Sequence, residues 1–255
     1  MMATFNSRFR AALGIAIFLA VPFFAVAQTN FQAQATREFQ RALGNYRSET
    51  NDAAAWEFAR ACFNLADLAT NNSQHASIAR QGIVACQRLI ARNPRSARGH
   101  YYLALNLGQL ARTESVGALG LVRKMRAEFE TALALNPRVD HAGPTRGLGL
   151  LYRDAPGWPF SIGNRRKAQQ YLQQAGAMAP DFPENRLDMI ESDLKWRQND
   201  AARRELAALD ALWPSAKKLL AATASPADWA NWTARRAAAR EKLAEIFDAG
   251  SSRRR

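Results

Sequence analysis

Histidine and cysteine are scarce in this chain of 255 residues, which carries three histidines and two cysteines. His75, His100 and His141 are widely spread and have no cysteine or acidic partner at ligand spacing, so no metal site is predicted. Ser161 is not in the Gly-x-Ser-x-Gly setting of a nucleophile elbow, and Asp140-His141 fits a loop pair better than a catalytic dyad. Because no nucleophile is paired with a base, the sequence predicts a protein that is not an enzyme and uses no cofactor.

Long apolar runs are also lacking. Residues 11–24 form the longest one, but it is shorter than the ~20 residues of a membrane span, and Pro22 interrupts it. Arg8 and Arg10 precede this run and Ala25-Val26-Ala27 follows it, a pattern that predicts a secretory signal peptide over residues 1–27, cleaved after Ala27. No cysteine stands at the junction, so no lipid anchor is expected. The alternative is an uncleaved anchor helix, but we expect an exported, periplasmic protein.

Acidic residues are outnumbered, since 22 Asp and Glu stand against 35 Lys and Arg, a net charge of +13. In a cytosolic protein such a balance favours nucleic acid, but export argues against that partner. Outside the cytoplasm, basic charge is more typical of solubility or of peripheral affinity for anionic lipid or cell-wall polymer. We expect one helical domain over residues 28–250 and a basic, flexible tail over residues 251–255.

Four prolines organise the rest of the chain. Pro94, Pro137, Pro180 and Pro214 are separated by 43, 43 and 34 residues, and each closes a similar phrase of mostly apolar residues. A helix is predicted to end at each, because proline lacks an N–H group and restricts the residue before it. A repeat of this period predicts an all-α solenoid of antiparallel helix pairs.

Helical periodicity divides the solenoid into about four pairs. An opening helix is predicted from about Phe31 to Tyr46, and Asn51 or Asp52 can cap the next helix. Ser225 and Pro226 suit the start of a C-terminal capping helix that reaches about Asp248.

The pattern within the pairs resembles the tetratricopeptide repeat (TPR). The matching residues are Ala168, Leu172, Ala175 and Pro180, then Phe129, Ala132 and Pro137, and the phrase Leu148-Gly149-Leu150-Leu151-Tyr152. Small residues let two helices approach, and the large residue fills the gap between units. The resemblance covers residues 52–214 and implies a TPR-like binding scaffold, with extra residues in the internal turns.

A narrower resemblance lies in three segments, 101–108, 143–149 and 155–163. These are similar to exported bacterial TPR proteins, the T component family associated with tripartite periplasmic (TRAP) transporters. That resemblance implies a periplasmic protein that meets a solute-binding protein or helps to deliver a small ligand, and it implies no catalysis. This chain lacks the lipid-anchor cysteine that some such proteins carry.

The insertion at residues 153–164 is the best candidate for function. It contains Trp158 and Phe160, and Pro156 and Pro159 stiffen it. The two aromatic side chains either cap a binding groove, which Tyr101 and Arg146 would help to line, or fold back to fill the core between units.

Cys62 and Cys86 lie in the two helices of one hairpin. In an oxidising compartment they either form a disulfide or remain two small buried apolar residues.

The sequence leaves three functions open. The first is a non-catalytic scaffold that binds another protein in the cell envelope. The second is a transporter-associated carrier of a small apolar ligand, and the third is a hydrolase that acts on the cell wall.

Overall fold

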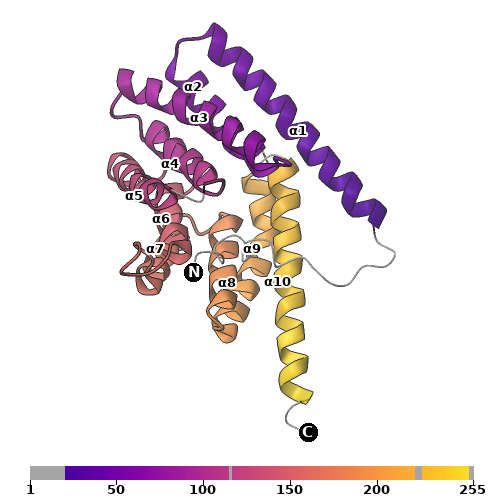
Figure 1. Ribbon diagram of the computed structural model, residues 1–255. Helices are drawn as coiled ribbons and strands as arrows, with labels where there is room; N and C mark the ends of the chain where they lie inside the picture. The colour runs from indigo at the N-terminus through magenta and orange to yellow at the C-terminus, as the bar shows by residue number, and fades with distance from the viewer. Residues whose placement is uncertain (1–20, 115–116, 222–225, 253–255) are drawn as a thin grey trace.

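The computed structural model describes residues 21–114, 117–221 and 226–252 (Figure 1). Within these residues the chain forms ten α-helices and no strand, which confirms the all-α prediction. The helices are α1 (Val21–Ser48), α2 (Asp52–Asp67), α3 (Asn72–Arg92), α4 (Ala97–Ala111), α5 (Ala118–Leu135), α6 (Gly143–Asp154), α7 (Arg165–Met178), α8 (Pro183–Lys195), α9 (Asn199–Leu219) and α10 (Pro226–Ser252).

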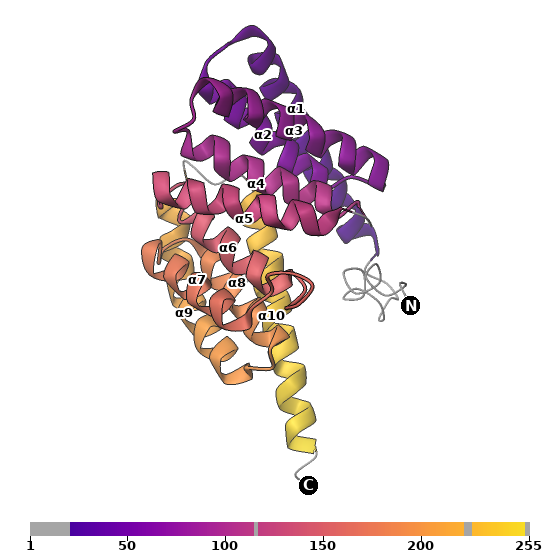
Figure 2. The ribbon, with the colours of Figure 1, turned by 60° about the vertical axis from the view of Figure 1, so that its left-hand side comes forward.

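Helices α2 to α9 form four consecutive pairs, and each pair stacks on the next (Figures 1 and 2). The first helices of successive pairs touch one another, α2 with α4, α4 with α6 and α6 with α8, so these four helices form one layer of the solenoid. Helix α1 packs on α2 at one end, and α10 packs on α8 and α9 at the other. The predicted opening and capping helices are therefore both present.

Local signals explain most of the helix ends. The side chains of Asn51, Asn71, Ser96 and Asn164 each accept a hydrogen bond from a backbone N–H in the first turn of the helix that follows. Helices α3, α5 and α7 end two residues before Pro94, Pro137 and Pro180, as predicted.

Pro214 is the exception, because α9 continues through it to Leu219. The prediction of a helix end there was wrong. Proline cannot donate to the carbonyl of Asp210, but the helix buries Leu209 and Ala216 on either side of the proline. Packing against α10 therefore outweighs the lost hydrogen bond.

The small residues of the TPR pattern are buried where the helices meet. Ala132, Ala168 and Ala175 are fully buried, and the large side chains of Phe129 and Leu172 are almost completely so. The pattern therefore acts as the resemblance implies, since small residues admit close helix contact and large ones fill the space between the helices.

Cys62 and Cys86 are both free and fully buried, so the structure does not contain the disulfide that the sequence allowed. Cys62 packs in a cluster with Phe39 and Phe58, whereas Cys86 packs in the central core with Tyr102. Burial raises the pKa of Cys62 to about 12 and raises that of Cys86 further, so both thiols stay protonated.

The two ends of the chain are described in part. Residues 1–20 lie outside the described residues, and α1 begins at Val21 and so includes the expected cleavage site at Ala27. At the other end, α10 extends to Ser252, into the predicted tail, and residues 253–255 lie outside the described part. None of the helices that the structure describes combines the length and the apolar character required to cross a bilayer.

Candidate functional site

A left-handed turn lies between α5 and α6. Asp140, His141 and Ala142 have φ angles of 49°, 53° and 68°, a region that residues other than glycine seldom adopt. Each such residue costs about 1–2 kcal/mol, so a run of three persists only where the surroundings hold it.

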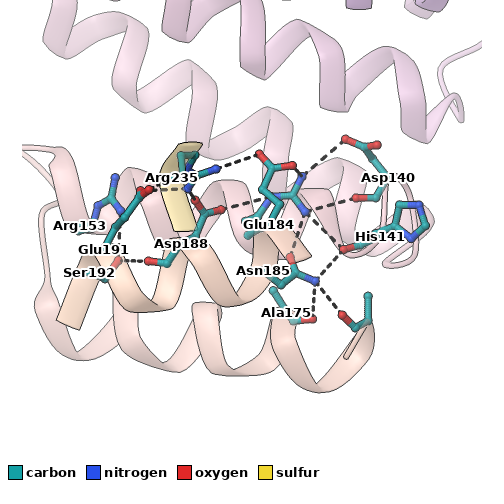
Figure 3. Close-up of polar contacts among 12 residues, drawn as sticks. Asp140, His141, Arg153, Ala175, Glu184, Asn185, Asp188, Glu191, Ser192 and Arg235 are labelled. Atoms are coloured by element: carbon teal, nitrogen blue, oxygen red, sulfur yellow. Dashed lines mark hydrogen bonds and ion pairs between the residues drawn. The ribbon is translucent and has the colours of Figure 1, made fainter. Parts of the chain in front are cut away.

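Three helices hold this turn. From α6, Nη1 of Arg146 donates to the carbonyl oxygens of His141 and Asp140 at 3.4 and 3.5 Å. From α4, the hydroxyl of Tyr101 donates to the Asp140 carboxylate at 2.8 Å. From α8, Nδ2 of Asn185 donates to the His141 carbonyl at 3.2 Å (Figure 3). Contacts from three successive repeats thus stabilise the strained backbone.

Tyr101 reaches the turn because α6 begins with glycine. A Cβ atom on Gly143 would lie 2.6 Å from the Tyr101 ring, too close for any other residue at that position. The absence of a side chain at Gly143 therefore allows α4 to place a hydroxyl group beside Asp140.

Asn185 links the turn to the end of α7. Its side-chain amide also donates to the carbonyls of Ala175 and Ala179, each at 3.1 Å, and its oxygen accepts from Arg146 at 3.0 Å. With 1% of its surface exposed, Asn185 gives a second donor to two carbonyls at the end of α7, each of which also accepts from a backbone N–H.

Beside the turn lies an ion network in which Arg146 and Asp188 are buried and the other members are partly exposed (Figure 3). The network comprises Asp140, Arg146, Glu184, Asp188, Glu191 and Arg235. Arg146 lies 3.6 Å from carboxylate oxygens of Asp140 and Asp188 and 3.7 Å from one of Glu184. Arg235 of α10 binds Asp188 and Glu191 at 2.6 Å each. Four carboxylates therefore share two guanidinium groups, and the network joins α6, α8 and α10.

The network shifts the pKa values of its members. Burial raises the pKa of Glu184, and the neighbouring Asp188 adds to this effect while Arg146 opposes it. Burial also raises the pKa of Tyr101 well above its usual value, so its hydroxyl remains a donor. The pKa of His141 is lowered, mainly by burial, which favours the neutral ring that stacks on Phe182 at 4.2 Å.

A cavity of about 310 Å³ opens beside the turn. Its walls come from α1, the first helix of every pair, the residues before α6 and α8, the residue after α9, and the first turns of α10. The lining residues are Glu38, Arg41, Arg60, Phe63, Asn64, Tyr101, Tyr102, Leu105, Asp140, His141, Gly143, Arg146, Gly147, Leu150, Phe182, Glu184, Leu220, Asp228 and Trp232.

The structure separates the predicted site residues into two places. Tyr101 and Arg146 both line the cavity, and Nη2 of Arg146 lies 3.5 Å from the Tyr101 hydroxyl. Trp158 and Phe160 do not line it, and 89% and 76% of their surfaces are exposed. They do not fill the core between units either, because Ile162 is the residue of the insertion that packs against the central cluster.

Sequence reasoning missed Asn185, Asp188 and Arg235. Asp188 and Asn185 are polar residues at positions of α8 that face the core, where the helical pattern predicts apolar residues. That departure could have identified them as candidate site residues. Arg235 carried no such signal, because it lies 47 residues from Asp188 and short-range patterns do not connect them.

Comparisons with known proteins bear on the fold. A family model described as regulator of microtubule dynamics protein 1-3 matches residues 24–142, slightly less than half of the chain. No curated protein is significantly similar to this chain.

Among solved structures, the chain is similar to a thermophilic TPR protein from Thermus thermophilus. The two share 23% identity with a TM-score of 0.57, over 85% of this chain and 94% of that one. This chain has a TPR-like fold. At this identity the likeness shows the fold alone, and it extends past the family match to the second half of the chain.

Proposed function

We propose that this protein is a non-catalytic scaffold of the bacterial cell envelope, exported to the periplasm, whose cavity binds an extended segment of another protein. The observation that carries the proposal is the origin of the walls, since the first helix of each of the four pairs contributes at least one side chain. A segment lying there would touch all four repeats at once. A repeat scaffold gains affinity in this way, by adding contacts from successive units.

The lining favours a peptide over a small apolar ligand. Aromatic rings such as Phe63 and Trp232 lie beside charged groups of both signs, among them Arg60 and Glu184. Polar side chains and main-chain amides of a peptide can pair with such groups, whereas an apolar ligand would leave them desolvated and unpaired. The carrier function was expected at an apolar cavity near Trp158, and Trp158 does not line this cavity.

Asp140 and His141, an acid and a base in the cavity wall, already have partners within the fold. Asp140 accepts from Tyr101, whose hydroxyl stays protonated because burial raises its pKa, and His141 stacks on Phe182. This arrangement suits a binding surface whose shape is fixed, and it supports a non-catalytic function over the hydrolase.

Filling the cavity tests the binding proposal. Asn64 is exposed on α2 and lines the cavity, so Asn64→Trp should block it while the fold remains intact. Peptides selected from a displayed random library on the wild-type protein should bind this variant at least about tenfold more weakly. Gln87→Trp is the matched control, because Gln87 is exposed on α3 and does not line the cavity. Peptides that bind both variants equally well would contradict the proposal.

Export has a separate test. The protein recovered from a periplasmic extract should begin at Gln28 when its N-terminus is sequenced. A chain that begins at Met1 and remains with membranes would overturn export, and would leave the cavity proposal standing.

A further inference from the structure

The insertion between α6 and α7 is a structured loop with its aromatic side chains outside. The Gly163 N–H donates to the Pro156 carbonyl at 2.8 Å, and the Phe160 N–H donates to the Gly157 carbonyl at 3.1 Å. A Cβ on Gly163 would collide with the Ala155 carbonyl oxygen, so only glycine lets the two sides of the loop approach so closely. Hydrogen bonds and close packing therefore define the conformation of the loop.

Apolar side chains of the loop divide into two groups. Ile162 points inward and packs on the central core, whereas Trp158 and Phe160 remain 89% and 76% exposed. Both aromatic side chains lie within three residues on a loop whose backbone is fixed, so they present apolar surface to the solvent together. Exposed apolar groups gathered in this way mark a surface that binds something.

Basic residues follow immediately. The first turn of α7 contains Arg165, Arg166 and Lys167, all exposed, and no acidic residue. A helix N-terminus favours acidic groups, so three cations there oppose the helix dipole. Arg165 lies over the Trp196 ring and Lys167 over the Tyr152 ring, but both keep their charge exposed. These ring contacts compensate Arg165 and Lys167 only in part, and no ion pair of Arg166 occurs among the described residues, so the charge of this turn is available to something outside the chain.

We propose that this loop is a membrane-docking tip, in which Trp158 and Phe160 enter the interface of an anionic bilayer and Arg165, Arg166 and Lys167 contact its phosphate groups. A protruding tip fits a planar interface, and aromatic rings beside cations are the residues that a membrane interface favours. The excess of Lys and Arg over Asp and Glu in the whole chain adds long-range attraction to an anionic surface. None of these five residues lines the cavity, so the peptide and the membrane would not compete for the same side chains.

Vesicle binding of the full chain tests this proposal. Wild-type protein should bind phosphatidylcholine vesicles that contain about one-third phosphatidylglycerol more tightly than vesicles of phosphatidylcholine alone. The double variant Trp158→Ala/Phe160→Ala should bind the anionic vesicles at least about tenfold more weakly. Phe247→Ala is the matched control, because Phe247 is equally apolar and 66% exposed on α10, and it should change binding by less than about twofold. Equal binding by the double variant and the control would overturn the proposal.

The charge contribution has its own control. Arg166→Ala should weaken binding several-fold at low salt and less at high salt, because salt screens exposed charges. Arg88→Ala replaces an equally exposed arginine on α3 and should have little effect. If both changes weaken binding equally, net charge alone explains the attraction and the tip is not the site.

A spectroscopic label separates the tip from the N-terminal segment, which all variants share. An environment-sensitive dye on Trp158→Cys should shift its emission to the blue with anionic vesicles, whereas the dye on Phe247→Cys should not. The native thiols are buried and should not compete for the label. A dye at position 158 that responds to a soluble envelope protein or to cell-wall polymer, and not to vesicles, would refute the membrane as the partner.

Discussion

Replacing Arg146 by methionine should destabilise the protein by about 3 kcal/mol at pH 7. Breaking a buried ion pair on one side generally costs about 3–5 kcal/mol, because the partner charge is left buried and uncompensated. Without Arg146, Glu184, Asp188 and Glu191 would share the single guanidinium of Arg235, and Asp140 would keep only the Tyr101 hydroxyl. We expect the lower end of the range, because Asp188 keeps Arg235 at 2.6 Å and about a third of the Asp140 and Glu184 side chains is exposed to water.

The loss should depend on pH. Burial already raises the pKa of Glu184, and removing the nearest guanidinium would raise it further. A carboxyl group whose pKa is higher in the folded state favours folding below its unfolded pKa, and that contribution is lost as the pH rises through the folded pKa. The difference between variant and wild type should therefore shrink as the pH falls from 7 towards 4.

Urea denaturation followed by circular dichroism at several pH values measures both effects. Arg203→Met is the matched control, because Arg203 makes an exposed pair with Asp200 at 2.9 Å, and its loss should cost less than about 0.5 kcal/mol. If Arg146→Met costs no more than this control, or if its cost grows as the pH falls, the network does not hold the turn electrostatically.

Three further predictions concern the rest of the fold. Arg197→Gly should stabilise the protein by about 0.5–1 kcal/mol in urea denaturation, because φ is 59° at this exposed position after α8, whereas Arg204→Gly within α9 should destabilise it. Burial, with a contribution from Glu205, raises the pKa of Asp193 to about 6. Asp193→Asn should therefore stabilise the protein on the order of 2 kcal/mol at pH 8 and hardly at pH 4 in the same urea assay. An equal gain in unfolding free energy at both pH values would contradict this prediction. Two thiols should react with a thiol reagent only after denaturation, and added reductant should leave the melting temperature unchanged; a chain without free thiols would refute the structure at Cys62 and Cys86.

The helices could be predicted from the sequence wherever a short-range signal sets their ends. Asn51 and Asn71 each accept a hydrogen bond from a backbone N–H three residues further on, and Pro94 restricts the residue before it. A few consecutive residues therefore contain everything that determines these helix ends. Pro214 carries the same signal, but the outcome there depends on α10, which no short window includes. Arg197, just after α8, has a left-handed backbone conformation that is typical of glycine. Because the residue is an arginine, the sequence gives no sign of this conformation.

The candidate site could be predicted only in part. Tyr101 and Arg146 were singled out as cavity residues, but the groups that hold them, Asp140 and Asn185, come from segments 39 residues away. Such pairs form because neighbouring repeats stack on one another. The spacing of residues along one helix does not predict which residues of two repeats will meet. The sequence likewise did not show which apolar residue of the insertion packs on the core, and in the structure it is Ile162, whereas Trp158 is exposed.

The ion network is better suited to fixing the shape of the cavity than to adding stability. Apolar residues of similar volume would often stabilise a core as much or more, since two charges must be removed from water to form a buried pair. Arg146, however, also donates to the carbonyls of the left-handed turn, which an apolar side chain could not do. Asn185 and Tyr101 hold the same turn from neighbouring repeats. The charges thus impose one conformation on the cavity wall, so that binding at this wall would cost less conformational entropy.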